Sequence, residues 1–142
     1  MGKILHPKQM NKCIGCFTCM NVCSTVNQKN HSITKSAIKV RTTGGMASSF
    51  IAIVCLGCSE PACMEVCPSG DALKKREGGG VLLNAEQCIG CRYCETRCIM
   101  RAINFDEETK KPIICRHCGT CSRFCPHDCL QMLETTEVRS HA

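Results

Sequence analysis

The sequence predicts a small α+β fold whose stability depends on cysteine. Of the 142 residues, 44% are hydrophobic, but that share includes 17 cysteines, and aromatic residues make up only 4%. A chain with so little apolar material needs covalent or metal links to offset its backbone entropy. The cysteines recur in regular groups, and strand-sized segments lie between these groups. The cysteines are therefore expected to hold the fold together.

Sixteen of the 17 cysteines fall into four groups of four, and Cys129 stands outside them. The groups are Cys13, Cys16, Cys19 and Cys23; Cys55, Cys58, Cys63 and Cys67; Cys88, Cys91, Cys94 and Cys98; and Cys115, Cys118, Cys121 and Cys125. The first and third groups both contain CIGC, and the second and fourth both end in Cys-Pro. This pattern indicates an internal duplication.

The segments between the groups have the lengths of short strands and helices. The strand candidates are residues 37–41, 49–54, 81–83, 103–105 and 112–114. The first two flank a turn at residues 43–45, which predicts a hairpin. Short helices are predicted around the fourth cysteine of each group, for example over residues 19–26 and 94–100. The polar tail, residues 134–142, is expected to fray or to dock on a partner.

The spacing within a group points to iron-sulfur chemistry. Three cysteines at positions i, i+3 and i+6 let one tight loop place three thiolates on three irons of a cubic 4Fe-4S cluster. The fourth cysteine, four residues later, points away from that cube and serves a second cluster. Gly15 and Gly90 let the backbone approach the sulfides, because glycine has no side chain. The sequence therefore predicts four 4Fe-4S clusters.

Two other kinds of site can be built from the same residues. Sixteen cysteines can form eight disulfides, or four zinc sites of four thiolates each. Disulfide frameworks need an oxidising compartment and give no reason for triplets at three-residue spacing. Structural zinc usually takes two CxxC pairs that lie far apart in the sequence. Iron-sulfur clusters are the favoured interpretation, and elemental analysis separates them from zinc.

The stretch CSEPACMEVCPSGDALKKREGGGVLLNAEQCIGCRYCETRC, residues 58–98, resembles the bacterial-type ferredoxins, which carry CxxCxxCxxxCP twice. Up to about Leu133, the chain is similar to the doubled, four-cluster version found as electron-transfer subunits of molybdenum and tungsten pterin oxidoreductases and some hydrogenases. The resemblance implies two interlocked ferredoxin-like units. Residues 1–54 and 99–142 would form the outer unit, and residues 55–98 the inner unit.

In that family the first cysteine group shares its clusters with the fourth, and the second with the third. The resemblance therefore implies four ligand sets: Cys13, Cys16, Cys19 and Cys125; Cys115, Cys118, Cys121 and Cys23; Cys55, Cys58, Cys63 and Cys98; and Cys88, Cys91, Cys94 and Cys67. The linker lengths are compatible with this pairing. Spacing alone leaves a pairing of the first group with the second open.

The chain departs from the family pattern at Ser24 and Ile99, which follow Cys23 and Cys98 where the family often has proline. Its compactness resembles the small subunits of tungsten aldehyde oxidoreductase-type complexes. The resemblance implies a non-catalytic subunit of anaerobic metabolism that passes electrons between a catalytic molybdenum or tungsten pterin subunit and a ferredoxin or flavoprotein. Self-association is compatible with the sequence. The alternatives are a free polyferredoxin, a hydrogenase or formate dehydrogenase-type electron-transfer subunit, and a zinc interaction module.

The charge of the protein bears on its partners. A net charge of +6 ordinarily suggests a polyanion such as nucleic acid. Each oxidised cluster with its four thiolates adds about −2, so four clusters reverse the sign. Because aromatic residues that stack on bases are scarce, no nucleic-acid partner is expected. The first residues show no export signal, and no run of about 18 apolar residues occurs, so a cytoplasmic protein without a membrane span is expected.

Several residues of interest lie outside the ligand sets. Cys129 is four residues past Cys125 and is expected to be a small buried hydrophobe instead of a competing ligand. His117 and His127 can hydrogen-bond a cluster sulfur, although a polar surface or supporting position is favoured over ligation. Residues 74–76 are basic and are expected in a solvated turn. Because no catalytic triad, P-loop or dinucleotide motif is found, no catalytic residue is expected.

Overall fold

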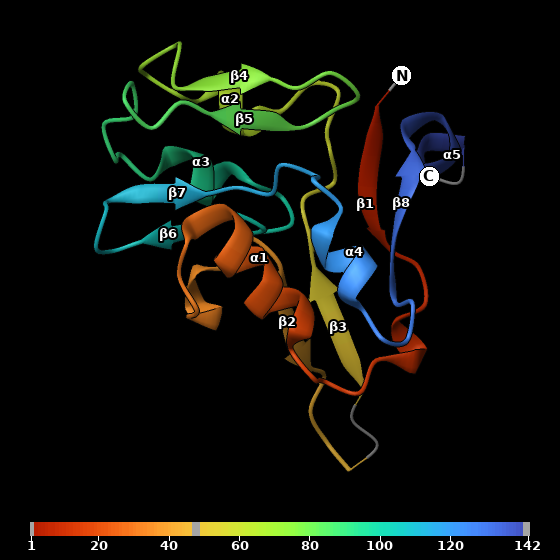
Figure 1. Ribbon diagram of the computed structural model, residues 1–142. Coiled ribbons are helices and arrows are strands. Elements are labelled where there is room, and N and C mark those ends of the chain that lie inside the picture. The colour runs from red at the N-terminus through yellow and green to blue at the C-terminus, as the bar shows by residue number, and fades with distance from the viewer. Residues whose placement is uncertain (1, 47–48, 141–142) are drawn as a thin grey trace.

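The computed structural model describes residues 2–46 and 49–140, with side chains described up to Glu137. Short helices and short strands alternate along the chain (Figure 1), which confirms the predicted α+β class. The strands are β1 (Lys3–Pro7), β2 (Lys39–Thr42), β3 (Phe50–Ile53), β4 (Leu73–Lys75), β5 (Val81–Leu83), β6 (Asn104–Asp106), β7 (Lys111–Ile113) and β8 (Leu130–Glu134). The helices are α1 (Thr18–Gln28), α2 (Ala62–Glu65), α3 (Tyr93–Arg97), α4 (Thr120–Phe124) and α5 (Thr135–Ser140), with 3-10 turns at Met10–Lys12 and Ile33–Lys35.

These strands pair into four separate antiparallel ribbons of two strands each. Three ribbons are local hairpins, β2–β3, β4–β5 and β6–β7, whereas the fourth joins β1 to β8 near the two ends of the chain. Figure 1 shows β1 and β8 side by side. In this ribbon Lys3 lies opposite Glu134, and Pro7 lies opposite Leu130. A two-stranded ribbon is marginally stable by itself. Each ribbon therefore depends on packing against the rest of the molecule.

The hairpins can be compared with the strand candidates. The hairpin predicted around residues 43–45 is confirmed, because Thr42 of β2 pairs with Phe50 of β3. Strands β6 and β7 lie within one residue of their candidates. The prediction of a solvated turn at residues 74–76 is wrong for the two lysines, which lie in β4. Leu73 is buried and pairs with Leu83, and this pairing draws the following lysines into the strand.

The four helices inside the cysteine groups each begin one residue before the third cysteine. Phe17, Arg92 and Gly119, which immediately precede three of these helices, have positive φ angles of 58°, 66° and 77°. This left-handed turn redirects the chain directly after the second cysteine and starts the helix there. The helices predicted over residues 19–26 and 94–100 are present as α1 and α3, and each begins one residue earlier than predicted.

Most of the buried apolar side chains of the described residues form two clusters. The larger contains Leu5, Met20, Cys23, Ala37, Ile38, Val40, Val54, Ile113, Cys115, Cys121 and Leu130. The smaller contains Leu73, Val81, Cys94 and Ile103. The larger cluster draws on both ends of the chain and the smaller mainly on its middle. Cysteines of the four groups are part of both. The division into units at residues 54/55 and 98/99 stays a prediction.

The polar tail is more ordered than expected. Strand β8 runs to Glu134, and α5 follows it directly. The hydroxyl of Thr135 lies 2.8 Å from the carbonyl oxygen of Gly2 and 2.6 Å from that of Gly78. The prediction of fraying is therefore wrong up to residue 140, because pairing with β1 anchors the tail, while residues 141–142 lie outside the described residues. In the described part of the chain, none of the helices has the length and hydropathy needed to cross a membrane.

Candidate metal centres

All seventeen cysteines lie in the described residues and are free thiols, so no disulfide framework is present. Within residues 2–46 and 49–140, no three His, Cys, Asp or Glu side chains converge closely enough to hold one metal ion. A zinc site needs four donors about 2.3 Å from a single ion. A 4Fe-4S cluster instead takes one thiolate on each of four separate irons, which suits more widely spaced donors.

Three cavities are each lined by the four cysteines of one implied ligand set. We call them site 1 (Cys13, Cys16, Cys19 and Cys125), site 3 (Cys55, Cys58, Cys63 and Cys98) and site 4 (Cys67, Cys88, Cys91 and Cys94). Each cavity combines three cysteines of one group with one cysteine of another. The structure thus brings the first group beside the fourth, and the second beside the third.

Site 2 consists of the remaining set, Cys23, Cys115, Cys118 and Cys121. Cys115 and Cys121 both interact electrostatically with Cys23 and Cys118. The side-chain amide nitrogen of Asn27 lies 3.7 Å from the sulfur of Cys23 and 3.9 Å from that of Cys118. These contacts gather the four thiols of site 2 between α1 and the loop that leads into α4. Each of the sixteen grouped cysteines therefore belongs to one of four sites, with four thiols in each site.

Burial changes the acidity of these thiols. It raises the pKa of Cys19 and Cys94 to about 11 and that of Cys63 and Cys115 to about 12, because a buried thiolate loses its hydration. Neighbouring cysteines of the same site push these pKa values in the same direction. Without a positive centre, these four thiols therefore stay largely neutral. A bound cluster would supply that positive charge, and the thiol protons would be released as it binds.

Polar side chains reach two of the exposed thiols. The hydroxyl of Thr18 lies 3.3 Å from the sulfur of Cys16, and that of Thr120 lies 3.5 Å from the sulfur of Cys118. At Cys118, burial acts upward on the pKa, but hydrogen bonds from Thr120 and Asn27 hold it below its usual value. Sequence reasoning missed these residues. The two threonines follow the second cysteine at the same offset, which was a usable signal, whereas Asn27 carries none.

Backbone amides support the fourth cysteine of three groups. The donors are Ala37 for Cys23, Ala102 for Cys98 and Cys129 for Cys125, each with its nitrogen 3.4 Å from the sulfur. Hydrogen bonds to the sulfurs are among the features that set the reduction potential of an iron-sulfur cluster. The main chain thus contributes to the electrostatics of sites 1, 2 and 3.

One backbone conformation recurs directly before the second cysteine of every group. Gly15, Gly57 and Gly90 have φ angles of 72°, 62° and 73°, and His117 has a φ of 54°. Glycine adopts this left-handed region without steric cost, unlike other residues. A Cβ atom on Gly15 would lie 2.4 Å from the ring of Phe50, so a side chain has no room there. The fourth group therefore carries a histidine where the other three carry glycine.

The residues outside the ligand sets differ in burial. His117 is only 3% exposed, so the surface interpretation is wrong for it. Strand β1 covers the ring, and Nδ1 accepts a hydrogen bond from the backbone nitrogen of Leu5 at 3.0 Å. Burial, together with the charge of Arg76, lowers the pKa of His117 to about 4. His127 is exposed, as expected. Cys129 is buried, as expected, and it also lines the cavity of site 1.

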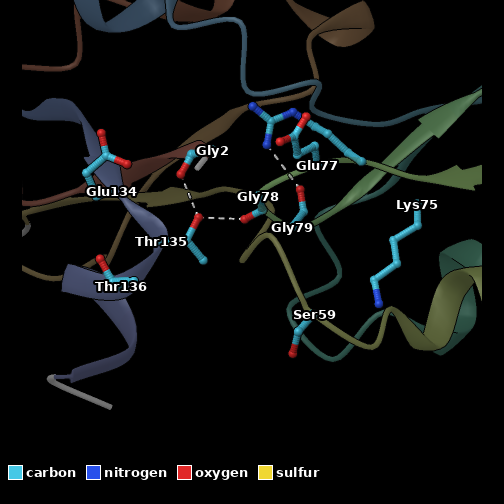
Figure 2. Close-up of a pocket in the computed structure, with 10 residues that line it drawn as sticks. Gly2, Ser59, Lys75, Glu77, Gly78, Gly79, Glu134, Thr135 and Thr136 are labelled. Carbon is cyan, nitrogen blue, oxygen red and sulfur yellow. Dashed lines mark hydrogen bonds between the residues drawn. The ribbon is translucent and has the colours of Figure 1, made fainter.

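A separate cavity of about 600 Å³ lies where the β4–β5 turn meets both ends of the chain. Figure 2 shows Thr135 between Gly2 and Gly78, with Lys75 on the opposite side of the cavity. None of the ten lining residues is a cysteine. Arg76, which also lines the cavity, donates hydrogen bonds to the carbonyl oxygens of Lys3 and Gly79 at 2.9 and 3.2 Å. These hydrogen bonds, with those of Thr135, connect the β4–β5 turn to both ends of the chain.

Comparison with known proteins agrees with this chemistry. Residues 48–99 match the family model described as a 4Fe-4S dicluster domain. Over 156 aligned residues the sequence is 30% identical to the B subunit of the anaerobic dimethyl sulfoxide reductase of Escherichia coli strain K12, and the match covers 91% of this sequence and 72% of that protein. The protein belongs to the family of dimethyl sulfoxide reductase B subunits.

Two further relatives of this chain are larger proteins. It is 30% identical to the beta subunit of the NADH-dependent phenylglyoxylate dehydrogenase of Aromatoleum evansii, with 89% of this chain and 29% of that subunit covered. It is 34% identical to ArrB, the iron-sulfur subunit of the arsenate respiratory reductase of Shewanella sp. strain ANA-3, with 70% and 44% covered. The chain thus spans less than half the length of both. The 4Fe-4S dicluster match covers its second and third cysteine groups.

Proposed function

We propose that the chain is a non-catalytic electron-transfer subunit that holds four 4Fe-4S clusters through the sixteen cysteines of sites 1 to 4. It passes electrons between a catalytic oxidoreductase subunit and a redox partner. The observation that carries the proposal is the gathering of four thiols at each of four places, three from one motif and one from another. Because each pair of motifs shares two sites, the two clusters of a pair must lie close together.

Electrostatic contacts between sites support an order for the path. The cysteine pairs that connect different sites are Cys19 with Cys121, Cys55 with Cys115, and Cys63 with Cys94. They connect site 1 to site 2, site 2 to site 3, and site 3 to site 4. In this proposal, electrons therefore move along the four clusters in the order 1, 2, 3, 4 or in the reverse direction. Sites 1 and 4 are the two ends.

Both ends of this path carry exposed apolar residues. Ile14 lies between two ligands of site 1 and is 63% exposed, and Ile89 lies between two ligands of site 4 and is 70% exposed. Such residues beside the ligands suit the docking of an electron donor at one end and an acceptor at the other. One partner is the catalytic subunit, and the other is a ferredoxin, a flavoprotein subunit or a second copy of the chain.

The proposed catalytic partner carries a molybdenum or tungsten pterin. The sequence resemblance supports this cofactor class, and the names of two relatives, a dimethyl sulfoxide reductase and an arsenate respiratory reductase, favour a reductase. A tungsten aldehyde oxidoreductase-type partner is a narrower form of the same proposal and rests on the sequence resemblance. A cytoplasmic location also belongs to the proposal.

The test is the metal content of protein purified without oxygen. About sixteen irons and sixteen sulfides per chain, with negligible zinc, are expected. About four zinc ions without sulfide would contradict the proposal. Purification of a tagged chain from its native cells then tests the partner. Co-purification of a subunit with stoichiometric molybdenum or tungsten is the expected result, whereas a fully loaded chain that remains alone would indicate a free polyferredoxin.

A further inference from the structure

The buried ring of His117 has one nitrogen that lacks a partner. Nδ1 accepts the hydrogen bond from the backbone nitrogen of Leu5, so the proton of the neutral ring lies on Nε2. Nε2 is buried and has no hydrogen-bond partner among the described protein atoms. Buried donors are almost always satisfied in native proteins, because an unpaired donor loses its hydration without compensation. The acceptor for this proton is therefore expected to be a group that the protein binds.

The backbone of His117 gives a second, independent observation. With a φ of 54°, it adopts the left-handed conformation that glycine provides at the same position of the other three groups. A residue with a Cβ atom is disfavoured in this region, and such strain persists mainly where the side chain is needed. Position 117 thus combines an unfavourable backbone conformation with a ring that carries an unpaired buried donor.

The unpaired donor faces the loop that carries two thiols of site 3. Nε2 lies 3.6 Å from the place where a Cβ atom on Gly57 would be, and 3.3 Å from the corresponding place on Gly80. Gly57 lies between Cys55 and Cys58, and its backbone amide hydrogen-bonds Cys55. The backbone nitrogen of Gly80 donates to the carbonyl oxygen of Cys58 at 3.0 Å. A side chain at Gly80 would crowd the imidazole, whereas one at Gly57 would meet it at an ordinary contact distance.

The main chain of the same residue belongs to the neighbouring site. The backbone nitrogen of His117 lies 3.4 Å from the sulfur of Cys115 in site 2 and donates a hydrogen bond to it. We propose that the Nε2–H of His117 donates a hydrogen bond to a sulfur atom of the cluster in site 3. His117 is then a positioning residue between the two central clusters, held by its backbone to one and by its imidazole to the other.

This inference rests on the proposed assignment of clusters to sites 2 and 3. Reduction adds negative charge to a cluster, so a donor aimed at one of its sulfurs stabilises the reduced state more than the oxidised state. The hydrogen bond of His117 therefore raises the reduction potential of the cluster in site 3. A change limited to this donor should lower one potential of the four.

Two substitutions separate the two nitrogens of the ring. The side-chain oxygen of His117→Asn can occupy the place of Nδ1 and accept from Leu5, but the side chain is too short to replace Nε2. Asparagine also tolerates the left-handed conformation. In His117→Gln, the longer side chain can place an amide N–H near the position of Nε2. His127→Asn is the matched control, because His127 lies two residues after Cys125, as His117 lies two residues after Cys115, but is exposed.

The experiment uses the anaerobically purified, cluster-loaded full chain and EPR-monitored redox titration. We expect His117→Asn to lower the midpoint potential of one cluster, His117→Gln to retain most of the wild-type value, and His127→Asn to change none. If His117 only supports the fold, both His117 variants lose thermal stability while all four potentials stay at their wild-type values. That result overturns the inference. A buried water that accepts the Nε2 proton of His117 in place of the cluster would also overturn it.

A second measurement does not depend on how well the variants fold. Wild-type protein is labelled with ¹⁵N at histidine Nε2, reduced, and examined by pulsed EPR. A ¹⁵N coupling to a cluster is expected in the wild type, and its absence overturns the inference directly. Iron analysis separates the two levels of the argument. Fewer than about sixteen irons per chain contradicts the proposed function, whereas a full load without coupling contradicts only the role of His117.

Discussion

The side-chain amide nitrogen of Asn27 lies 3.9 Å from the sulfur of Cys118, a residue 91 positions further along the chain. The same nitrogen lies 3.7 Å from the sulfur of Cys23. Arg116 donates a hydrogen bond at 2.8 Å to the amide oxygen, which fixes the orientation of the group. A single amide on α1 thus serves two thiols that come from opposite ends of the sequence.

Replacement of this amide should change the potential of one cluster. Asn27→Leu keeps the approximate size of the side chain and removes the donor, so the reduced state of the cluster at site 2 loses stabilisation. The midpoint potential is expected to fall by tens of millivolts, where about 59 mV corresponds to a tenfold change for one electron. EPR-monitored titration of the loaded chain measures it. Asn21→Leu, on an exposed position of the same helix, is the control, and equal potentials in both variants would contradict the prediction.

Cysteine substitutions should distinguish ligands from the extra thiol. Cys98→Ser is expected to reduce the iron content, because Cys98 lines site 3 with the thiols of another group. Cys129→Ser is expected to retain about sixteen irons, since Cys129 lies outside the four sets although it lines site 1. Iron and sulfide analysis of both variants is the measurement. Loss of one cluster in Cys129→Ser with none lost in Cys98→Ser would reverse the assignment.

A substitution in the larger core should destabilise the chain strongly. Ile38 is 1% exposed, and Ile38→Ala leaves a cavity that costs about 2–5 kcal/mol of unfolding free energy. Ile51 lies in the neighbouring hairpin and is 45% exposed, so Ile51→Ala should change stability by only about 0.5 kcal/mol. Anaerobic denaturant titration of the loaded protein compares them. Similar midpoints for the two variants would show that this core contributes little.

The carboxylate of Asp106 predicts a defined pH dependence. Burial acts upward on its pKa, but hydrogen bonds from the Thr109 hydroxyl and the Glu108 backbone nitrogen and the charge of Lys35 hold the pKa below its usual value. The stabilisation is therefore present above the unfolded pKa and is lost as the pH falls through the lower folded value. Asp106→Asn should lower the unfolding temperature by a constant amount between about pH 5 and 8, with the difference shrinking below about pH 4. A difference that vanishes already at about pH 6 would disagree with this prediction.

Removal of the clusters should unfold the chain. The two apolar cores are small and include cysteines of the sites, so little else offsets the backbone entropy. After anaerobic treatment with an oxidant and an iron chelator, near-ultraviolet circular dichroism should vanish and protease cleavage should become rapid. Cleavage as slow as that of the loaded protein would show that the fold persists without metal.

Local features of the fold could be predicted from the sequence. The hairpin β2–β3 follows from two apolar segments and a glycine turn between them, all within residues 37–54. The pairing of β1 with β8 could not be predicted, because no local pattern connects residues 3–7 with residues 130–134. Strand β4 was missed for a different reason: it has only three residues, and two of them are lysines.

The cysteine sites, like the fold, could be predicted from the sequence only in part. The cysteine spacing identified the four groups, because the chemistry of a cluster imposes a repeat on the sequence. The burial of His117 could not be predicted, because it depends on β1 covering the ring and on a hydrogen bond across 112 positions. The histidine in place of a glycine was visible in CRHC beside CIGC and CLGC, but its meaning depends on the φ angle that the four groups share.

The closure of the fold by β1 and β8 has a consequence for its biosynthesis. Once residue 98 has left the ribosome, every cysteine of sites 3 and 4 is available. Sites 1 and 2 must wait, because their first-group cysteines depend on partners up to Cys125. The N-terminal strand then remains without its partner until residues 130–134 are made. During synthesis, the partners within the middle of the chain therefore become available first, and the partner strand of β1 becomes available among the last.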